Sequence, residues 1–255
     1  MRRYMIVAAM AVLAASCTIA DGNMERKPID VGKSIAREAA RRLDYTNEAI
    51  CWALAADEYL STEDESVQSD IYQNIFRCNL TPKINQSRDT VSLVSESGMA
   101  YYTYTTDGRL LSEGGKWNTW LDDITIEPKE GGIYEVRSYI DSSEHDATNK
   151  YALDIHNKVM DGYLSYDMSG SVEYVYDKEG GKSLSIEIDD KISYTSQLRS
   201  NRYGNRAIGF YNGKFNVTYI DIWAGYNDEV TLTYGDKNDD SATVGYLGDK
   251  GSIEI

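Results

Sequence analysis

Histidine, cysteine, proline and phenylalanine are scarce in this sequence of 255 residues, with 2, 3, 3 and 3 copies respectively. Two histidines exclude a zinc centre that is held by three histidines. Neither His145 nor His156 belongs to an HExxH motif, and a Gly-x-Ser-x-Gly nucleophile turn is missing. We therefore expect no catalytic residue, no metal site and no cofactor. His156 alternates with Leu153 and Ile155, which predicts that it lies on the solvent face of a strand.

Long apolar runs are also missing. The run from Met5 to Ala15 is too short to span a bilayer, and Arg2 and Arg3 precede it. A positively charged start followed by a short apolar run is typical of an export signal. We therefore expect the mature protein to lie in the cell envelope or outside the cell.

The end of this run, Leu13-Ala14-Ala15-Ser16-Cys17, resembles the signal of bacterial lipoproteins. In that family a cysteine after small residues is lipidated and becomes the new N-terminus. The resemblance implies a signal peptide over 1–16, a lipid on Cys17, and attachment to the outer membrane on its periplasmic or its surface face. Ala14 stands where leucine is commonest, so ordinary cleavage with an unmodified Cys17 is the alternative. The polar stretch 17–29 is then a tether between membrane and domain.

Basic residues are few compared with acidic ones. Without Arg2 and Arg3 the chain keeps 24 basic and 41 acidic residues, a formal charge of −17. A field of this sign repels nucleic acid and anionic lipid headgroups. We expect no nucleic-acid partner, and we expect membrane attachment to come from the lipid.

The two remaining cysteines, Cys51 and Cys78, form an even pair in a compartment that permits disulfides. A bridge between them closes a loop of about 27 residues and contributes on the order of 3 kcal/mol. Two buried free thiols are the equal alternative.

Helical periodicity marks the segment 30–80. Asp30 is a candidate N-cap, Thr46 a candidate restart of a second helix, and Asp57 and Glu58 face away from the apolar stripe. A weaker helical turn follows around Ile71. We expect this helical part to pack on the rest of the chain.

From about Thr90 onward the apolar period changes to two, and turns that contain glycine recur about every ten residues, so we expect a β-domain over 81–255. Tyr is frequent, with 21 copies, and suits half-buried strands. The pattern predicts a mainly β chain: an antiparallel β-meander, sandwich or barrel. Hairpin turns are expected at Gly131-Gly132 and Asn212-Gly213, among others.

Candidate contact residues are aromatic or hydroxylated. Trp117 and Trp120 are three apart, so on a strand one of them faces out of the core and can stack on a sugar ring. Asp89-Thr90-Val91 and Asp240-Ser241-Ala242 resemble the Asp-Ser/Thr-apolar sequon with which some diderm anaerobes O-glycosylate exported proteins. That resemblance implies glycans on Thr90 and Ser241.

These observations favour an envelope lipoprotein that acts by binding or as an architectural surface component, with a glycan or another envelope protein as its partner. An envelope enzyme that acts on glycans is the first alternative, and an outer-membrane β-barrel is the second.

Overall fold

The computed structural model describes residues 28–76, 81–87, 90–94, 96–97, 100–105, 115–119, 123–138, 148–160, 163–176, 181–196, 209–239 and 241–254. Within them a long helix, α2 (Pro28–Ser61), and a short one, α3 (Glu65–Asn74), precede all the strands. The strands are β1 (Thr81–Ile84), β2 (Thr90–Val94), β3 (Ala100–Thr105), β4 (Gly115–Thr119), β5 (Asp123–Lys129), β6 (Ile133–Ser138), β7 (Thr148–Met160), β8 (Leu164–Val175), β9 (Lys182–Thr195), β10 (Phe210–Tyr211), β11 (Gly213–Asp221), β12 (Tyr226–Tyr234), β13 (Ser241–Tyr246) and β14 (Asp249–Glu254).

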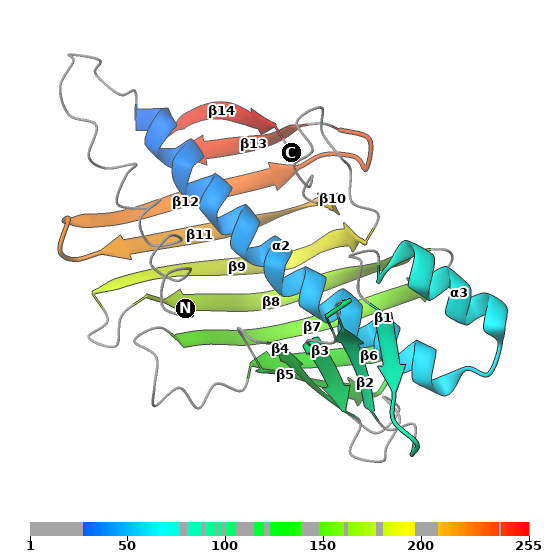
Figure 1. Cartoon of the computed structure of the whole chain (residues 1–255). Coiled ribbons are helices and arrows are strands. Elements are labelled where there is room, and N and C mark those ends of the chain that lie inside the picture. Colours follow the sequence, from blue (N-terminus) through cyan, green and yellow to red (C-terminus); the bar gives the residue numbers. More distant parts are fainter. Residues whose placement is uncertain are drawn as a thin grey trace.

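All the strands belong to one antiparallel sheet that follows the order of the chain, from β1 at one end to β14 at the other. Of the meander, sandwich and barrel that the sequence left open, this order is that of a meander. The prediction of a mainly β chain with a helical N-terminal part is confirmed. Helix α2 crosses one face of the sheet diagonally, from β14 towards β1–β4 (Figure 1).

The helix lies close to the sheet because its contact face carries small residues. Ala36, Ala39 and Ala40 are fully buried there. At Gly32 even a Cβ atom would come within 2.5 Å of the Cβ of Tyr246, so α2 needs glycine where it meets the end of β13. On the sheet side, the Tyr246 side chain occupies the space beside Gly32.

Alternation along the long strands sends one set of side chains to α2 and the other outward. The predicted runs Leu184, Ile186, Ile188 and Val230, Leu232, Tyr234 are buried, and so are Val172, Tyr174, Phe215 and Val217. The helix therefore closes the apolar face of the sheet, and the opposite face of the sheet carries polar residues.

Three expectations about the helical part are wrong. Helix α2 begins at Pro28, so Asp30 lies inside its first turn and not at the cap. It also continues through Thr46 without a restart. The buried Thr46 hydroxyl donates to the carbonyl oxygen of Arg42, and the Asn47 amide donates to that of Leu43. Both polar side chains are thus satisfied inside the helix.

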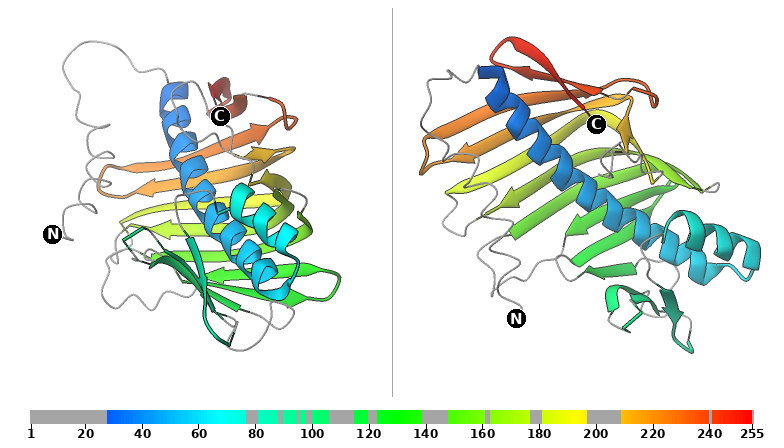
Figure 2. Two further views of the ribbon diagram at one scale, coloured as in Figure 1. Left: turned by 45° about the vertical axis from the view of Figure 1, so that its right-hand side comes forward. Right: turned by 45° about the horizontal axis from the view of Figure 1, so that its top comes forward.

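Asp57 is buried and does not face away from the core. From Ala49 to Asp57 every residue of α2 is buried. The reason is that α3 and the strands β2–β4 also contact α2, and the short strands turn out of the plane of the long ones beside its C-terminal half (Figure 2). None of the helices in the described part of the chain combines the length and the apolar character that crossing a membrane requires.

The turn at Gly131-Gly132 joins β5 to β6 as predicted. The hairpin expected at Asn212-Gly213 is wrong. Strands β10 and β11 both pair with β9, and their registers on β9 differ by one residue. Asn212, with φ of 50°, is therefore a β-bulge between two segments that pair with the same strand, β9.

Candidate functional site

The outward face of the long strands carries a set of polar side chains that contact one another around Asp167. In the register of the sheet, Asp167 of β8 lies opposite Ser193 of β9 on one side and His156 of β7 on the other. His156 alternates with the buried Leu153 and Ile155, so its predicted position on the outward face is confirmed. Its Nε2 atom lies 3.2 Å from the Oγ atom of Ser169.

The carboxylate of Asp167 accepts three hydrogen bonds. The Ser193 hydroxyl donates to Oδ1 at 2.6 Å, while the Asn157 amide and the Lys191 ammonium donate to Oδ2 at 3.0 Å and 3.1 Å. The side chain of Asp167 is 15% exposed, whereas that of Lys191 is 59% exposed. The Asp167 carboxylate is therefore largely buried and held in place, whereas the Lys191 side chain extends into solvent.

A β-bulge puts Asn157 within reach of Asp167. The register between β7 and β8 shifts between His156 and Val159. Asn157 sits in this shift with φ of 53°, a left-handed conformation that asparagine adopts more readily than most residues. A regular strand would send the side chain after His156 to the other face, so the bulge is what brings the amide to the carboxylate.

The pKa of Asp167 lies below its ordinary value. Burial acts to raise this pKa, but the hydrogen bonds from Ser193, Asn157 and Lys191, with the positive charge of Lys191, outweigh the burial. The carboxylate is consequently ionised at neutral pH and acts as a hydrogen-bond acceptor.

Tyrosine rings border the carboxylate on the side of β10. Tyr211 pairs with Ser193 in the register, and burial followed by the charge of Asp167 raises the pKa of its hydroxyl. The Lys237 ammonium lies 5.5 Å from the ring centroid of Tyr211 and 4.6 Å from that of Tyr163. We call Asn157, Asp167, Lys191, Ser193 and Tyr211 together the Asp167 cluster.

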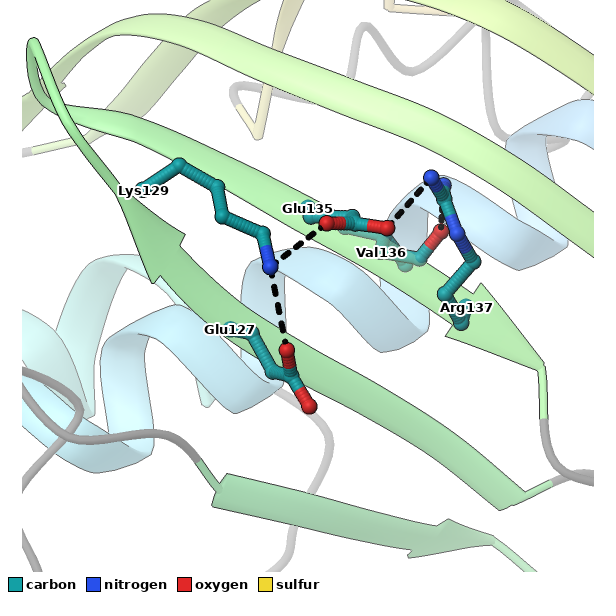
Figure 3. Close-up of polar contacts among 5 residues, drawn as sticks. All are labelled: Glu127, Lys129, Glu135, Val136 and Arg137. Carbon is teal, nitrogen blue, oxygen red and sulfur yellow. Dashed lines mark hydrogen bonds and ion pairs between the residues drawn. The ribbon is translucent and has the colours of Figure 1, made fainter.

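A second group of charges lies on the β5–β6 hairpin and is of a different kind. Lys129 contacts Glu127 at 3.2 Å and Glu135 at 2.7 Å, and Arg137 contacts Glu135 as well (Figure 3). The hydrogen bond from Lys129 lowers the pKa of Glu135. Two cations and two anions neutralise one another here, and three of the four side chains are about half exposed. Such surface pairs contribute little to stability and leave no net charge for a ligand.

The residues that the sequence singled out do not meet in one place. Cys17, Cys78 and Trp120 lie outside the described residues. Trp117 belongs to β4, where its backbone pairs with Tyr104 and Ile124, but its side chain lies outside the described part. A shared sugar-stacking surface of Trp117 and Trp120 therefore stays a prediction.

Thr90 and Ser241 are each the first residue of a strand, β2 and β13 respectively. Ser241 is exposed, and Thr90 is partly buried and lies opposite Thr105. These strands are far apart in the sheet. Glycosylation of the two hydroxyl groups stays a prediction.

Cys51 is a free thiol, buried between α2 and the sheet. Its Sγ atom donates to the hydroxyl of Tyr166 at 3.7 Å, and burial raises its pKa far above the ordinary value. The free thiol is one of the two alternatives that the sequence allowed. Because Cys78 lies outside the described residues, its pairing stays a prediction.

Sequence reasoning missed the Asp167 cluster because its members come from four strands, one of which carries a bulge. In the sequence, these residues look like any polar positions in strands of alternating polarity. Only the register of β8 on β9 brings Asp167 next to Lys191 and Ser193. The single local signal was an asparagine next to His156.

In the described residues, His, Cys, Asp and Glu side chains form no group of three that could hold a metal ion. Comparisons of the chain with known protein families, with curated proteins and with solved structures find no match. The chemistry of the site thus has to be argued from its geometry.

Proposed function

We propose that this chain is an exported envelope protein, anchored to the outer membrane by a lipid on Cys17, that acts by non-covalent binding at the outward face of its sheet. The export signal and the lipoprotein-like segment Leu13–Cys17 support the anchor. Support for the binding role comes from the Asp167 cluster, on the face of the sheet that α2 leaves open.

The observation that carries the binding role is the fixed, ionised carboxylate of Asp167. Its three donors hold it in one orientation and keep its pKa low. A carboxylate has room for about four acceptor contacts. Asp167 can therefore accept one more hydrogen bond, from a ligand that approaches beside Lys191.

A polyhydroxylated ligand fits this surface best. Each hydroxyl group of a sugar both donates and accepts a hydrogen bond. The Asp167 cluster presents an acceptor at Asp167 and donors at Asn157 and Lys191 within one small area, with the rings of Tyr211 and Tyr163 beside them. The proposed ligand class is a neutral glycan of the envelope, since the acidic chain repels anionic polymers.

The alternative of a glycan-cleaving enzyme needs a carboxyl group that is protonated at neutral pH, and hence a raised pKa. Asp167 and Glu135 are both shifted in the opposite direction. Binding therefore fits the Asp167 cluster better than acid catalysis does.

The test is an array of neutral oligosaccharides and envelope polysaccharides probed with the full mature chain. We expect retention on at least one neutral glycan, and at least a tenfold weaker interaction for Asp167→Asn. The matched control is Asp154→Asn, which removes a charge from the same face of β7 opposite Glu135. Equal retention of wild type and Asp167→Asn would overturn the proposed site, and so would binding to an envelope protein but to no glycan.

A further inference from the structure

Four large apolar side chains are exposed at one end of the sheet. Ile222, Trp223 and Tyr226, at the turn between β11 and β12, are 65%, 75% and 45% exposed, and Leu247, at the turn between β13 and β14, is 75% exposed. We call these four residues the apolar end. Single exposed apolar residues are common, but four of them on two neighbouring turns need an explanation.

The β11–β12 turn holds its apolar residues in a defined arrangement. Asp221 accepts a hydrogen bond from the backbone of Ala224 at 3.0 Å and lies 3.5 Å from Lys182. The backbone N–H of Ile222 donates to the carbonyl oxygen of Gly181 at 2.7 Å, which ties the turn to the start of β9. Ile222 and Trp223 are thus displayed by an ordered turn.

Leu247 is exposed at a position that disfavours leucine. Its φ is 50° and that of Gly248 is 86°, which are the left-handed values of a two-residue turn that normally takes Asn-Gly. The left-handed conformation is strained for leucine, and the exposed Leu247 side chain does not offset this strain by burial in the core. Strain that the fold itself does not require indicates that Leu247 contacts something outside the chain.

The apolar end lies at the end of the molecule where α2 begins. Gly32, in the first turns of α2, packs against Tyr246, which immediately precedes Leu247. The Tyr246 hydroxyl donates to Asp228 at 2.6 Å, and Asp228 follows Tyr226 by two residues. In Figure 1 the start of α2 and the turns after β11 and β13 lie on the left side of the sheet.

Cys17 precedes Pro28 by 11 residues. A chain of that length spans at most about 40 Å when fully extended, and a flexible one has a root-mean-square end-to-end distance of about 18 Å. A lipid on Cys17 would therefore hold the start of α2, and the apolar end beside it, near the membrane surface.

We propose that the apolar end inserts into the headgroup region of the bilayer to which the chain is anchored, and so orients the domain on it. This inference rests on the proposed lipid anchor. Tryptophan and tyrosine suit this region because one part of each ring system is apolar and the other is polar. The acidic chain favours zwitterionic headgroups over anionic ones.

The experiment uses the lipidated full chain in phosphatidylcholine vesicles that carry brominated acyl chains, which quench nearby tryptophans. One of the four tryptophans is Trp223, so we expect a loss of up to about a quarter of the emission. This loss disappears in Trp223→Tyr. It persists in Tyr72→Ser, a control that removes a 45% exposed ring on α3.

Leu247→Asn separates a membrane role from a structural one. Asparagine suits the left-handed conformation, so the variant is expected to raise the melting temperature by about 2–4 °C while it weakens the quenching of Trp223. A lower melting temperature would mean that Leu247 serves the fold, and would count against the proposal.

Failure of the anchor and failure of the apolar end give different results. If intact mass shows no lipid on Cys17, the same chain is held on the vesicles by an N-terminal histidine tag and a nickel-chelating lipid, and quenching of Trp223 still supports the insertion. Absence of quenching in a chain that is held on the vesicles overturns it. Self-association that is lost in Trp223→Tyr, without quenching, also overturns it, because a second copy then covers the apolar end.

Discussion

The hydroxyl group of Tyr166, in β8, donates a hydrogen bond of 2.6 Å to Oδ1 of Asn47, in the middle of α2. Both residues are buried, and the amide of Asn47 also donates to the carbonyl oxygen of Leu43. The same hydroxyl accepts from the thiol of Cys51. This group fixes the position of the helix on the sheet, and with it which face of the sheet stays open.

Tyr166→Phe is expected to lower the free energy of unfolding by about 1–3 kcal/mol, because Oδ1 of Asn47 stays buried without its donor. Urea unfolding followed by tryptophan fluorescence measures this loss. In the double variant Tyr166→Phe, Asn47→Leu both polar partners are gone, and the loss should be smaller than the sum of the two single losses. An unchanged unfolding free energy in Tyr166→Phe contradicts the role given to this hydrogen bond.

Asp167 makes the stability of the sheet dependent on pH in the acid range. Its pKa is lowered in the folded chain, so its contribution is fully present above the ordinary value of about 3.9 and is lost as the pH falls through the folded value. We expect the decrease in unfolding free energy below about pH 4 to be shallower in Asp167→Asn than in the wild type. Urea unfolding at a series of pH values measures the slope.

Asp154→Asn serves as the control for that slope, since Asp154 lies on the same face of the sheet in β7. Its profile should follow that of the wild type. Superimposable slopes for Asp167→Asn and wild type would show that the three hydrogen bonds do not hold the carboxylate as described.

Cys51 should be unreactive in the folded protein. Burial raises its pKa and excludes reagents, so little thiolate is available. In the Cys17→Ala, Cys78→Ala variant it is the last of the three cysteines. We expect no reaction with Ellman's reagent until the chain is unfolded, and then one thiol. Rapid labelling of the folded chain contradicts the burial.

The same reagent decides the pairing of Cys51 with Cys78. Unfolded Cys17→Ala chain that was never reduced should give two thiols if the free Cys51 of the structure is the native state. A result of zero thiols would establish the bridge between them.

The two-residue period of apolar residues and the composition predicted the fold class, because the two faces of the sheet differ in polarity. Leu184, Ile186 and Ile188 alternate with polar residues and are buried against α2. The same reasoning failed at Asp57, since an amphipathic pattern assumes that a helix is covered on one side only, and α2 is covered on several. It failed at Asn212 because a bulge and a hairpin turn use the same residue types.

The Asp167 cluster depends on information that no local pattern holds. Asp167 and Ser193 are 26 residues apart and become neighbours through the register of β8 on β9. A shift of that register by one residue would send one of the two to the core. The apolar end was equally hidden, because the exposure of Trp223 follows from the position of the turn between β11 and β12.

Intact mass combined with membrane fractionation shows whether a lipid on Cys17 anchors the chain. We expect the native protein to lose residues 1–16, to gain the mass of an acylated diacylglyceryl group and to sediment with membranes, and we expect Cys17→Ala to show neither the added mass nor the attachment. Equal solubility of the two proteins, or equal membrane retention without added mass, would overturn the lipid anchor.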